Sequence, residues 1–310
     1  MSPLSAALGE DDRPATWPQG RSVLDLLGAR GELTRWYPQE TLRASKAGPA
    51  ALFSTHKVLR YGDGGGADCH SGGGDDSGYN SGGGYTMHQL QLKVVAAEEL
   101  NALLVAVTAL VRGANPGGVS VSNKGGWQSG GNLLELSGAG EGRGDSVERL
   151  CSEAVACFSA ALDEAVAAAL PELLEDQTQG KRGPTRAWIN ENRAGHYNGC
   201  HTHGAGGFSG VYYVSIPPLG EEEGGGGDED DGSSSKAFNA VACGCLGMRT
   251  YDDKSEFLPG VSSDQGRFSL IRPIEGMLVL FPSVLEHCAL PFYDEEPATA
   301  GARISVAFNI

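Results

Sequence analysis

The segment 303–310 constrains the fold of this chain more than any other part of the sequence. If it is extended, successive side chains point to opposite faces. One face then carries Arg303, Ser305, Ala307 and Asn309. The other face is apolar throughout, with Ile304, Val306, Phe308 and Ile310. Such a strand needs a hydrophobic layer on one side and a polar cavity on the other, or else lies at a sheet edge with its polar face in solvent.

Two long helical patterns could supply the hydrophobic layer. Residues 96–112 place their apolar side chains at helical spacing, with Leu100, Leu103, Leu104, Val107, Leu110 and Val111 on one face. Residues 145–174 form a second, alanine-rich pattern. Short strands follow after residue 184, most clearly at 188–192, 210–216, 277–281 and 303–310, and 51–61 is a further candidate strand. We therefore expect an α+β protein.

The net charge of −16 is concentrated in two glycine-rich stretches. Residues 62–84 and 220–235 hold eleven of the 39 acidic residues and no Lys or Arg. Without them, 28 acids face 23 bases, a net charge of −5. Both stretches are predicted to be disordered inserts, because they cannot bury enough apolar surface to offset chain entropy. Since no basic stripe is present, nucleic-acid binding is not expected.

The remaining composition predicts a cytoplasmic protein. Seven cysteines without a regular spacing indicate reduced thiols. Residues 1–21 contain acids and prolines and no apolar core, so we expect no secretory signal. No apolar run reaches the roughly 18 residues of a membrane span, so no membrane partner is expected. The predicted division is an N-terminal extension (1–49), a helical support region (50–185) and a catalytic core (186–310).

Three histidines form a candidate metal centre. His201 and His203 share one face of an extended segment, and His287 follows 86 positions after His201. Arg303 lies a further 16 positions on and could hold an anion. Cys200 and Cys288 adjoin two of these histidines, and strand alternation predicts that both thiols turn away and serve packing.

The order of motifs resembles that of the 2-oxoglutarate–iron(II) oxygenase family, a branch of the non-haem iron dioxygenase superfamily. The order is His201-x-His203, the apolar run 276–282, His287 and Arg303-x-Ser305. The resemblance covers residues 51–310 outside the two inserts. It includes Ser122-Asn123, the segment 125–129, Trp188-x-Asn190-x-Asn192, the segment 209–213 and Phe281-Pro282-Ser283.

The resemblance implies a double-stranded β-helix (a jelly-roll or cupin-like core) with N-terminal helices packed on one sheet. It implies Fe(II) as cofactor, 2-oxoglutarate as co-substrate and hydroxylation of a C–H bond, with release of succinate and CO2. The implied metal ligands are His201, His203 and His287. The implied co-substrate residues are Arg303, Ser305, Tyr213 and Asn190. Further candidate pocket residues are Trp127, Ser209, Tyr212 and Asn309, and packing in the core is the alternative for Trp127, Tyr212 and Asn309.

Position 203 leaves alternatives open, because the superfamily usually has Asp or Glu there. His203 either binds the metal or stands beside the ligand set. Three histidines suit zinc as well as iron, so a cupin-like metalloenzyme without 2-oxoglutarate is the alternative enzyme. A catalytically silent barrel that uses its acidic loops for interactions is the third hypothesis. The substrate is a small molecule or a peptide, and the oligomeric state, including a homodimer, stays open.

Overall fold

The structure is a computed structural model that describes residues 52–61, 85–138, 146–170, 184–204, 207–217, 243–250, 267–293 and 301–310. The predicted extension 1–49 and the predicted inserts 62–84 and 220–235 lie outside these residues. The predicted division into three regions stays a prediction.

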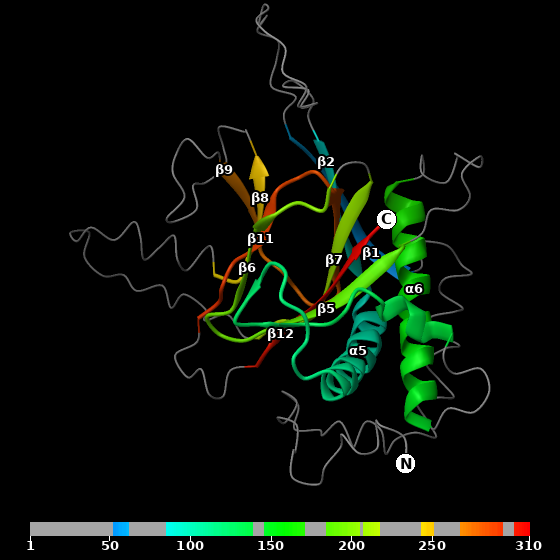
Figure 1. Ribbon diagram of the computed structural model, residues 1–310. Helices are drawn as coiled ribbons and strands as arrows, with labels where there is room; N and C mark the ends of the chain where they lie inside the picture. Colours follow the sequence, from blue (N-terminus) through cyan, green and yellow to red (C-terminus); the bar gives the residue numbers. More distant parts are fainter. Residues whose placement is uncertain are drawn as a thin grey trace, which may run out of the picture.

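Two antiparallel sheets form the body of the protein (Figure 1). The larger has seven strands in the order β1 (Phe53–Tyr61), β2 (Tyr85–Leu92), β10 (Met277–Pro282), β7 (Phe208–Ser215), β12 (Arg303–Asn309), β5 (Arg186–Asn192) and β4 (Trp127–Gln128). The smaller has five strands in the order β3 (Asn123–Lys124), β6 (Tyr197–His201), β11 (His287–Ala289), β8 (Leu246–Thr250) and β9 (Arg267–Ile271).

From β5 onward the chain passes repeatedly between the two sheets. Strands β5, β7, β10 and β12 belong to the seven-stranded sheet, and β6, β8, β9 and β11 belong to the five-stranded sheet. This alternation is the winding of a double-stranded β-helix, or jelly roll. It places residues that are far apart in sequence on neighbouring strands. For example, His201 of β6 pairs with His287 of β11.

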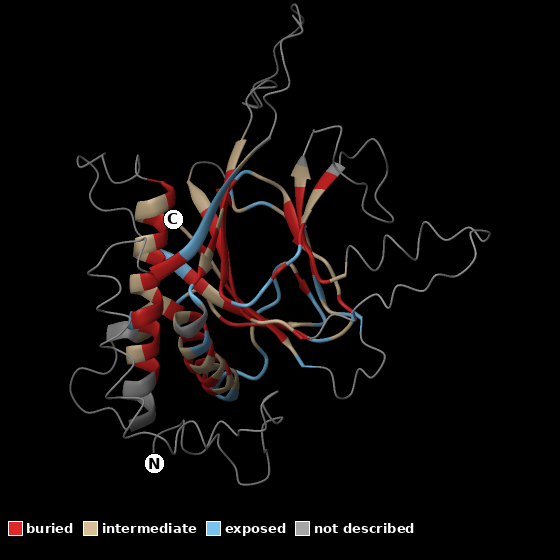
Figure 2. Ribbon diagram, turned by 180° about the vertical axis from the view of Figure 1, so that it is seen from behind, coloured by how far each residue is buried: buried red, intermediate tan, exposed pale blue. Residues whose placement is uncertain are grey.

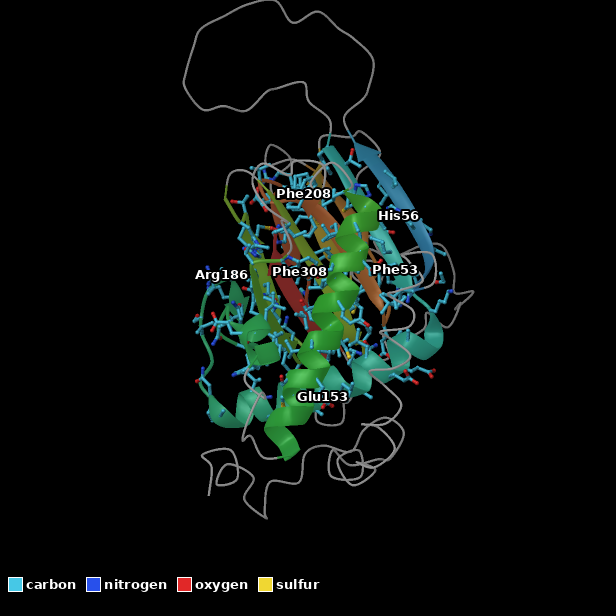
Figure 3. The ribbon with its side chains drawn as sticks, turned by 90° about the vertical axis from the view of Figure 1, so that its right-hand side faces the viewer. Phe53, His56, Glu153, Arg186, Phe208 and Phe308 are labelled. Atoms are coloured by element: carbon cyan, nitrogen blue, oxygen red, sulfur yellow. The ribbon has the colours of Figure 1, made fainter. Side chains whose placement is uncertain are left out.

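Helices α5 (Val94–Ala114) and α6 (Ser146–Ala169) lie on the outer face of the seven-stranded sheet, together with the short helix η1 (Leu133–Gly138) (Figures 1 and 3). Their apolar faces and the sheet share the main core. Tyr212 of β7 illustrates the contact: its ring lies 5.6 Å from that of Phe158, and its hydroxyl donates to Asn101 Oδ1 at 2.7 Å. None of the described helices is long and apolar enough to cross a membrane.

A second apolar cluster lies between the two sheets. It joins Val211, Tyr213 and Val279 of the larger sheet to Leu246 and Met248 of the smaller one. Strand β10 is therefore buried on both faces, and Met277 to Phe281 are all buried. Figure 2 shows these buried central strands in red. Burial on both faces explains why β10 is a continuous apolar run rather than an alternating one.

The predicted two-sided character of 303–310 is confirmed. Ile304, Val306 and Phe308 pack in the helix-facing core, while Arg303 and Ser305 are buried on the opposite face. A glycine makes room for the largest of these side chains. Gly210 pairs with Phe308 across β7 and β12, and a Cβ at residue 210 would lie 2.3 Å from the Phe308 ring.

Both long helices and five of the strands were predicted, and the other strands were not. The helices 96–112 and 145–174 correspond to α5 and α6, and the five predicted strands correspond to β1, β5, β7, β10 and β12. Strands β2, β6, β8, β9 and β11 were not predicted. Strand β2 pairs with β10, so residues that precede the helices belong to the same sheet as Arg303 and Ser305.

Tyr212→Phe should destabilise the protein by about 1–3 kcal/mol, because Asn101 Oδ1 would stay buried after losing its donor. Tyr197→Phe is the matched control. Tyr197 is 42% exposed, so its loss should change the free energy of unfolding by less than about 0.5 kcal/mol. Urea denaturation of both variants measures the difference. Equal stabilities would contradict the role given to the Tyr212 hydroxyl.

Candidate metal centre

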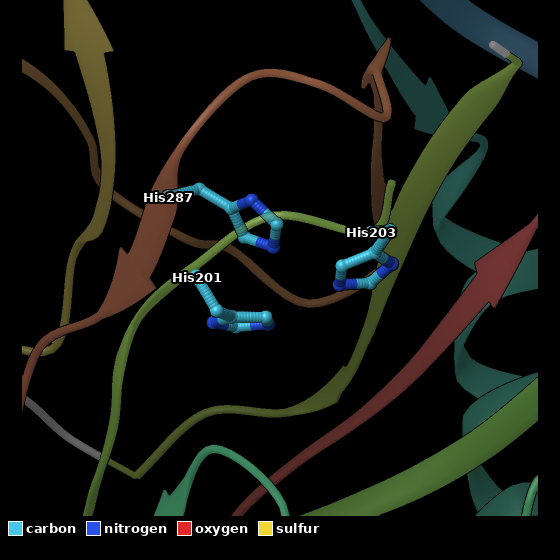
Figure 4. Close-up of side chains that lie close together, drawn as sticks. All are labelled: His201, His203 and His287. Carbon is cyan, nitrogen blue, oxygen red and sulfur yellow. The ribbon is translucent and has the colours of Figure 1, made fainter. Parts of the chain in front are cut away.

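The three histidines come together from two neighbouring strands and a connection (Figure 4). His201 ends β6 and His287 begins β11, and the two residues pair across the five-stranded sheet. His203 lies in the connection from β6 toward β7 of the other sheet. The ligand set therefore spans the change from one sheet to the other.

The separations suit a single metal ion. The ring centroids lie 4.4 Å (His201–His287), 4.9 Å (His203–His287) and 5.1 Å (His201–His203) apart. One nitrogen from each ring lies within 4.8 Å of the other two. An ion about 2.1 Å from each nitrogen would need nitrogens roughly 3–3.5 Å apart. Small ring movements would close that difference.

Backbone carbonyls set the orientation of two rings. His201 Nδ1 lies 2.7 Å from the carbonyl oxygen of Gly199, and His287 Nδ1 lies 2.9 Å from that of Leu285. A carbonyl oxygen only accepts hydrogen bonds, so each Nδ1 must carry the proton. The lone pair then resides on Nε2, which is the nitrogen left free to bind a metal.

Hydrogen-bonded side chains set the orientation of the His203 ring. Its Nδ1 lies 2.6 Å from Asn309 Oδ1, which also accepts a hydrogen bond from Ser209 Oγ at 3.0 Å. Ser209 Oγ in turn lies 2.8 Å from Ser283 Oγ. Ser283 also fixes the local backbone, because its carbonyl accepts from His203 N and its amide donates to the carbonyl of Gly207. All three rings thus have an Nδ1 hydrogen bond, which leaves each Nε2 available to a metal.

Burial keeps two of the imidazoles uncharged. Desolvation lowers the pKa of His287 to about 3, with a smaller contribution from His201. Desolvation also lowers the pKa of His203, although its hydrogen bond to Asn309 acts in the opposite direction. A metal binds neutral imidazole, so these two ligands need not lose a proton at neutral pH.

Arg303 is a buried cation without a carboxylate partner in the described part of the chain. It is 3% exposed, and its Nη1 donates to the carbonyls of Gly244 at 2.8 Å and Leu290 at 2.9 Å. Its Nη2 is buried with no hydrogen-bond partner among the described residues. Burial lowers the pKa of the guanidinium. An unneutralised buried charge with a free donor indicates a site for an anionic ligand.

Ser305 and its cross-strand neighbours lie on the same face as Arg303. Ser305 pairs with Asn190 of β5 and Tyr213 of β7. Tyr213 packs between the sheets, where burial raises the pKa of its hydroxyl and the nearby charge of Arg303 acts in the opposite direction. Gln128 of β4 pairs with Asn190, and the amide oxygens of both are buried without a partner among the described residues. Gln128 was not among the predicted site residues.

The assignment of Tyr212 and Trp127 to the pocket was wrong. Tyr212 points toward the helices, because strand alternation places it on the face opposite to Tyr213. Trp127 also packs in the helix-facing core, and its Nε1 donates to the carbonyl of Asn115 at 3.0 Å. Its cross-strand partner Glu191 forms an ion pair with Arg112 of α5, so this face of the sheet is the one that the helices cover.

Other residues have roles that differ from those predicted. Ser209 and Asn309 lie at the site, where they hold His203. Trp188 was overlooked as a pocket residue, although its ring lies 5.4 Å from that of His203. It shares a strand face with Asn190, so alternation could have identified it. Cys288 is buried as expected, whereas Cys200 is exposed and does not serve core packing.

Asn309→Ala should weaken metal affinity about 10- to 100-fold, because the partner that orients His203 would be lost. Asn309→Asp keeps an oxygen acceptor and should retain most of the affinity. Competitive titration with Co(II) and a chromophoric chelator would measure both variants. If the alanine variant binds as tightly as the parent, the hydrogen bond to Asn309 does not position His203.

The metal-free protein should lose stability as the pH falls from 6.5 toward 3. The folded-state pKa of His287 lies below its ordinary value of 6.5, so the unfolded chain takes up the proton first. The contribution of His287 is therefore fully present above pH 6.5 and declines below it. Urea denaturation at pH 7.5 and 4.5 should show a smaller loss for His287→Gln than for the parent. An equal loss would exclude His287 as its source.

A comparison with known protein families matches one part of the chain. Residues 186–309 match the model of the family described as "Putative 2OG-Fe(II) oxygenase". This range contains all three histidines, Arg303 and Ser305. A comparison with curated proteins finds no match.

Several solved structures resemble the protein. A prolyl-4-hydroxylase from Pseudomonas putida is 16% identical over 72% of this chain and 91% of its own, with a TM-score of 0.40. AviO1 from Streptomyces viridochromogenes is 13% identical over 72% and 88%, with a TM-score of 0.36. A viral collagen prolyl hydroxylase from Paramecium Bursaria Chlorella virus-1 is 12% identical over 69% and 89%, with a TM-score of 0.32.

These TM-scores are below 0.5, so the assignment rests on the family match. The family name specifies iron(II), 2-oxoglutarate and oxygenase chemistry, and the three-histidine cluster is compatible with the metal. Residues 186–309 therefore match the 2OG-Fe(II) oxygenase family, which is a family of oxidoreductases.

Proposed function

We propose that this protein is a non-haem Fe(II)- and 2-oxoglutarate-dependent dioxygenase that hydroxylates a C–H bond of a small-molecule or peptide substrate. One observation carries the proposal. Three imidazoles from β6, β11 and the connection between the sheets gather around one point, and each has its Nδ1 occupied by a hydrogen bond. Such a set presents three Nε2 lone pairs to one metal ion.

Iron would be held by His201, His203 and His287. His203 stands where the usual facial triad has a carboxylate, so the protein contributes one negative charge fewer. The negative charge of 2-oxoglutarate would partly offset that loss. The hydrogen bond from His203 Nδ1 to Asn309 supports a role as ligand, since it leaves Nε2 free on the side of the other two rings.

The distal carboxylate of 2-oxoglutarate would bind Arg303. The free Nη2 donor and the absence of a carboxylate partner among the described residues support this assignment. A guanidinium can grip a carboxylate with two parallel hydrogen bonds, and the hydroxyls of Ser305 and Tyr213 would add donors. Asn190 lies beside Ser305 and would contact the same ligand.

The bound iron and 2-oxoglutarate would supply oxidative decarboxylation to succinate and CO2, coupled to hydroxylation of the substrate. The protein supplies position and environment. Neighbouring strands hold His201 and His287, and the apolar cluster between the sheets limits the access of water to the buried face of Arg303.

Anaerobic addition of Fe(II) and 2-oxoglutarate should produce a weak visible charge-transfer band in the parent protein. His203→Ala should lose the band. Arg303→Ala should raise the half-saturating 2-oxoglutarate concentration about tenfold or more, because charge-assisted hydrogen bonds would be lost. His196→Ala is the matched control. His196 lies outside the cluster, where its Nδ1 accepts a hydrogen bond from the amide of Arg193, so this variant should keep the band.

Different results would favour the other two functions. Tight metal binding without any band, together with an unchanged Arg303→Ala variant, would favour a three-histidine metalloenzyme that does not use 2-oxoglutarate. Failure of the parent protein to bind metal would favour a catalytically silent barrel. Conversion of 2-oxoglutarate to succinate in the presence of oxygen would exclude both.

A further inference from the structure

Two cysteines are the immediate sequence neighbours of two of the candidate metal-binding histidines. Cys200 directly precedes His201 on β6, and Cys288 directly follows His287 on β11. His201 and His287 pair across these antiparallel strands, and the register shift that follows leaves Cys288 opposite Gly199 and Cys200. Strand alternation directs them to the face opposite to the histidines.

The side chains of Cys200 and Cys288 lie within hydrogen-bonding reach of each other. Cys200 is exposed, whereas Cys288 is 3% exposed and packs beside Phe268. The pair therefore combines one sulfur that a dissolved reagent can reach with a second that is sheltered and adjacent.

Disulfides join Cα atoms about 4.4–6.8 Å apart, a range that residues facing each other on neighbouring antiparallel strands commonly meet. We propose that Cys200 and Cys288 are a redox modification site: a peroxide converts them into a reversible cross-strand disulfide, which weakens metal binding by the adjacent histidines.

The chemistry takes two balanced steps. The Cys200 thiolate attacks one oxygen of hydrogen peroxide, the O–O bond breaks, and with one proton the products are a sulfenic acid and water. The Cys288 sulfur then attacks the Cys200 sulfur and loses its proton, the S–O bond breaks, and water leaves as the disulfide forms. Overall, two thiols lose two electrons and two protons, and one peroxide becomes two waters.

The disulfide would weaken metal binding because it would disturb the contacts that orient the histidine rings. This part of the proposal rests on the proposed function. A disulfide brings the Cβ atoms to about 3.8 Å, closer than the roughly 4.5–5.5 Å of an unlinked pair. The pull acts next to Gly199, whose carbonyl orients His201. It also acts next to His287, where the strand pairing is already irregular. Both disturbances should reduce the fit of the ligand set.

The modification itself is tested on the metal-free protein. After treatment with hydrogen peroxide and then catalase, non-reducing peptide mapping should find a peptide pair linked through Cys200 and Cys288, with a mass about 2 Da below the sum of the reduced peptides. Dithiothreitol should reverse the link. Cys243→Ser, which removes another partly exposed thiol, should still form it, and Cys200→Ser should not. Cys200 found only as a sulfinic acid, or linked to another molecule, would overturn the proposal.

The coupling is tested with Co(II) titrations of the reduced and oxidised parent. Oxidation should weaken Co(II) affinity about tenfold, dithiothreitol should restore it, and Cys200→Ser should not respond to peroxide. Unchanged affinity in a fully linked sample would overturn the coupling. If even the reduced protein fails to bind Co(II), the proposed function fails, and the peptide map still decides whether the disulfide forms.

Discussion

The division of the seven-stranded sheet into two unlike faces is the constraint on which the rest of the structure depends. On one face Ile304, Val306 and Phe308 pack against the helices and hold β12 in place. On the other face the same strand presents Arg303 and Ser305 to the space between the sheets. Burial of a guanidinium is unfavourable by several kcal/mol. The apolar contacts of its neighbours offset part of that free energy.

The candidate metal centre depends on this arrangement because the hydrogen-bond acceptors that orient its histidine rings come from both sheets. His201 and His287 are oriented by carbonyls of their own segments, while His203 is oriented by Asn309 of β12. The third ring is therefore tied to the large sheet and the other two to the small sheet. A ligand set held in this way keeps its geometry only while the two sheets keep their separation.

The sequence reveals those features that depend on local periodicity. Apolar spacing predicts α5 and α6, alternation predicts the two faces of β12, and the His-x-His spacing predicts a shared face for His201 and His203. The acceptors at Gly199 and Leu285 are backbone carbonyls. Every residue has one, so the residue type does not predict this role. The assignment of Tyr212 and Trp127 to the pocket failed because immediate neighbours on a strand face opposite ways, so only some residues of a motif segment face the site.

The long sequence separations within the metal centre also bear on how the protein folds. His287 lies 86 positions after His201, and the hydrogen bond between His203 and Asn309 joins residues 106 positions apart. Closing such loops loses chain entropy before any contact compensates for it, and folds dominated by distant pairings form slowly. No local fragment contains the ligand set. Metal capture is therefore expected to follow the assembly of both sheets, so that the ion acts on a finished scaffold rather than as a nucleus for folding.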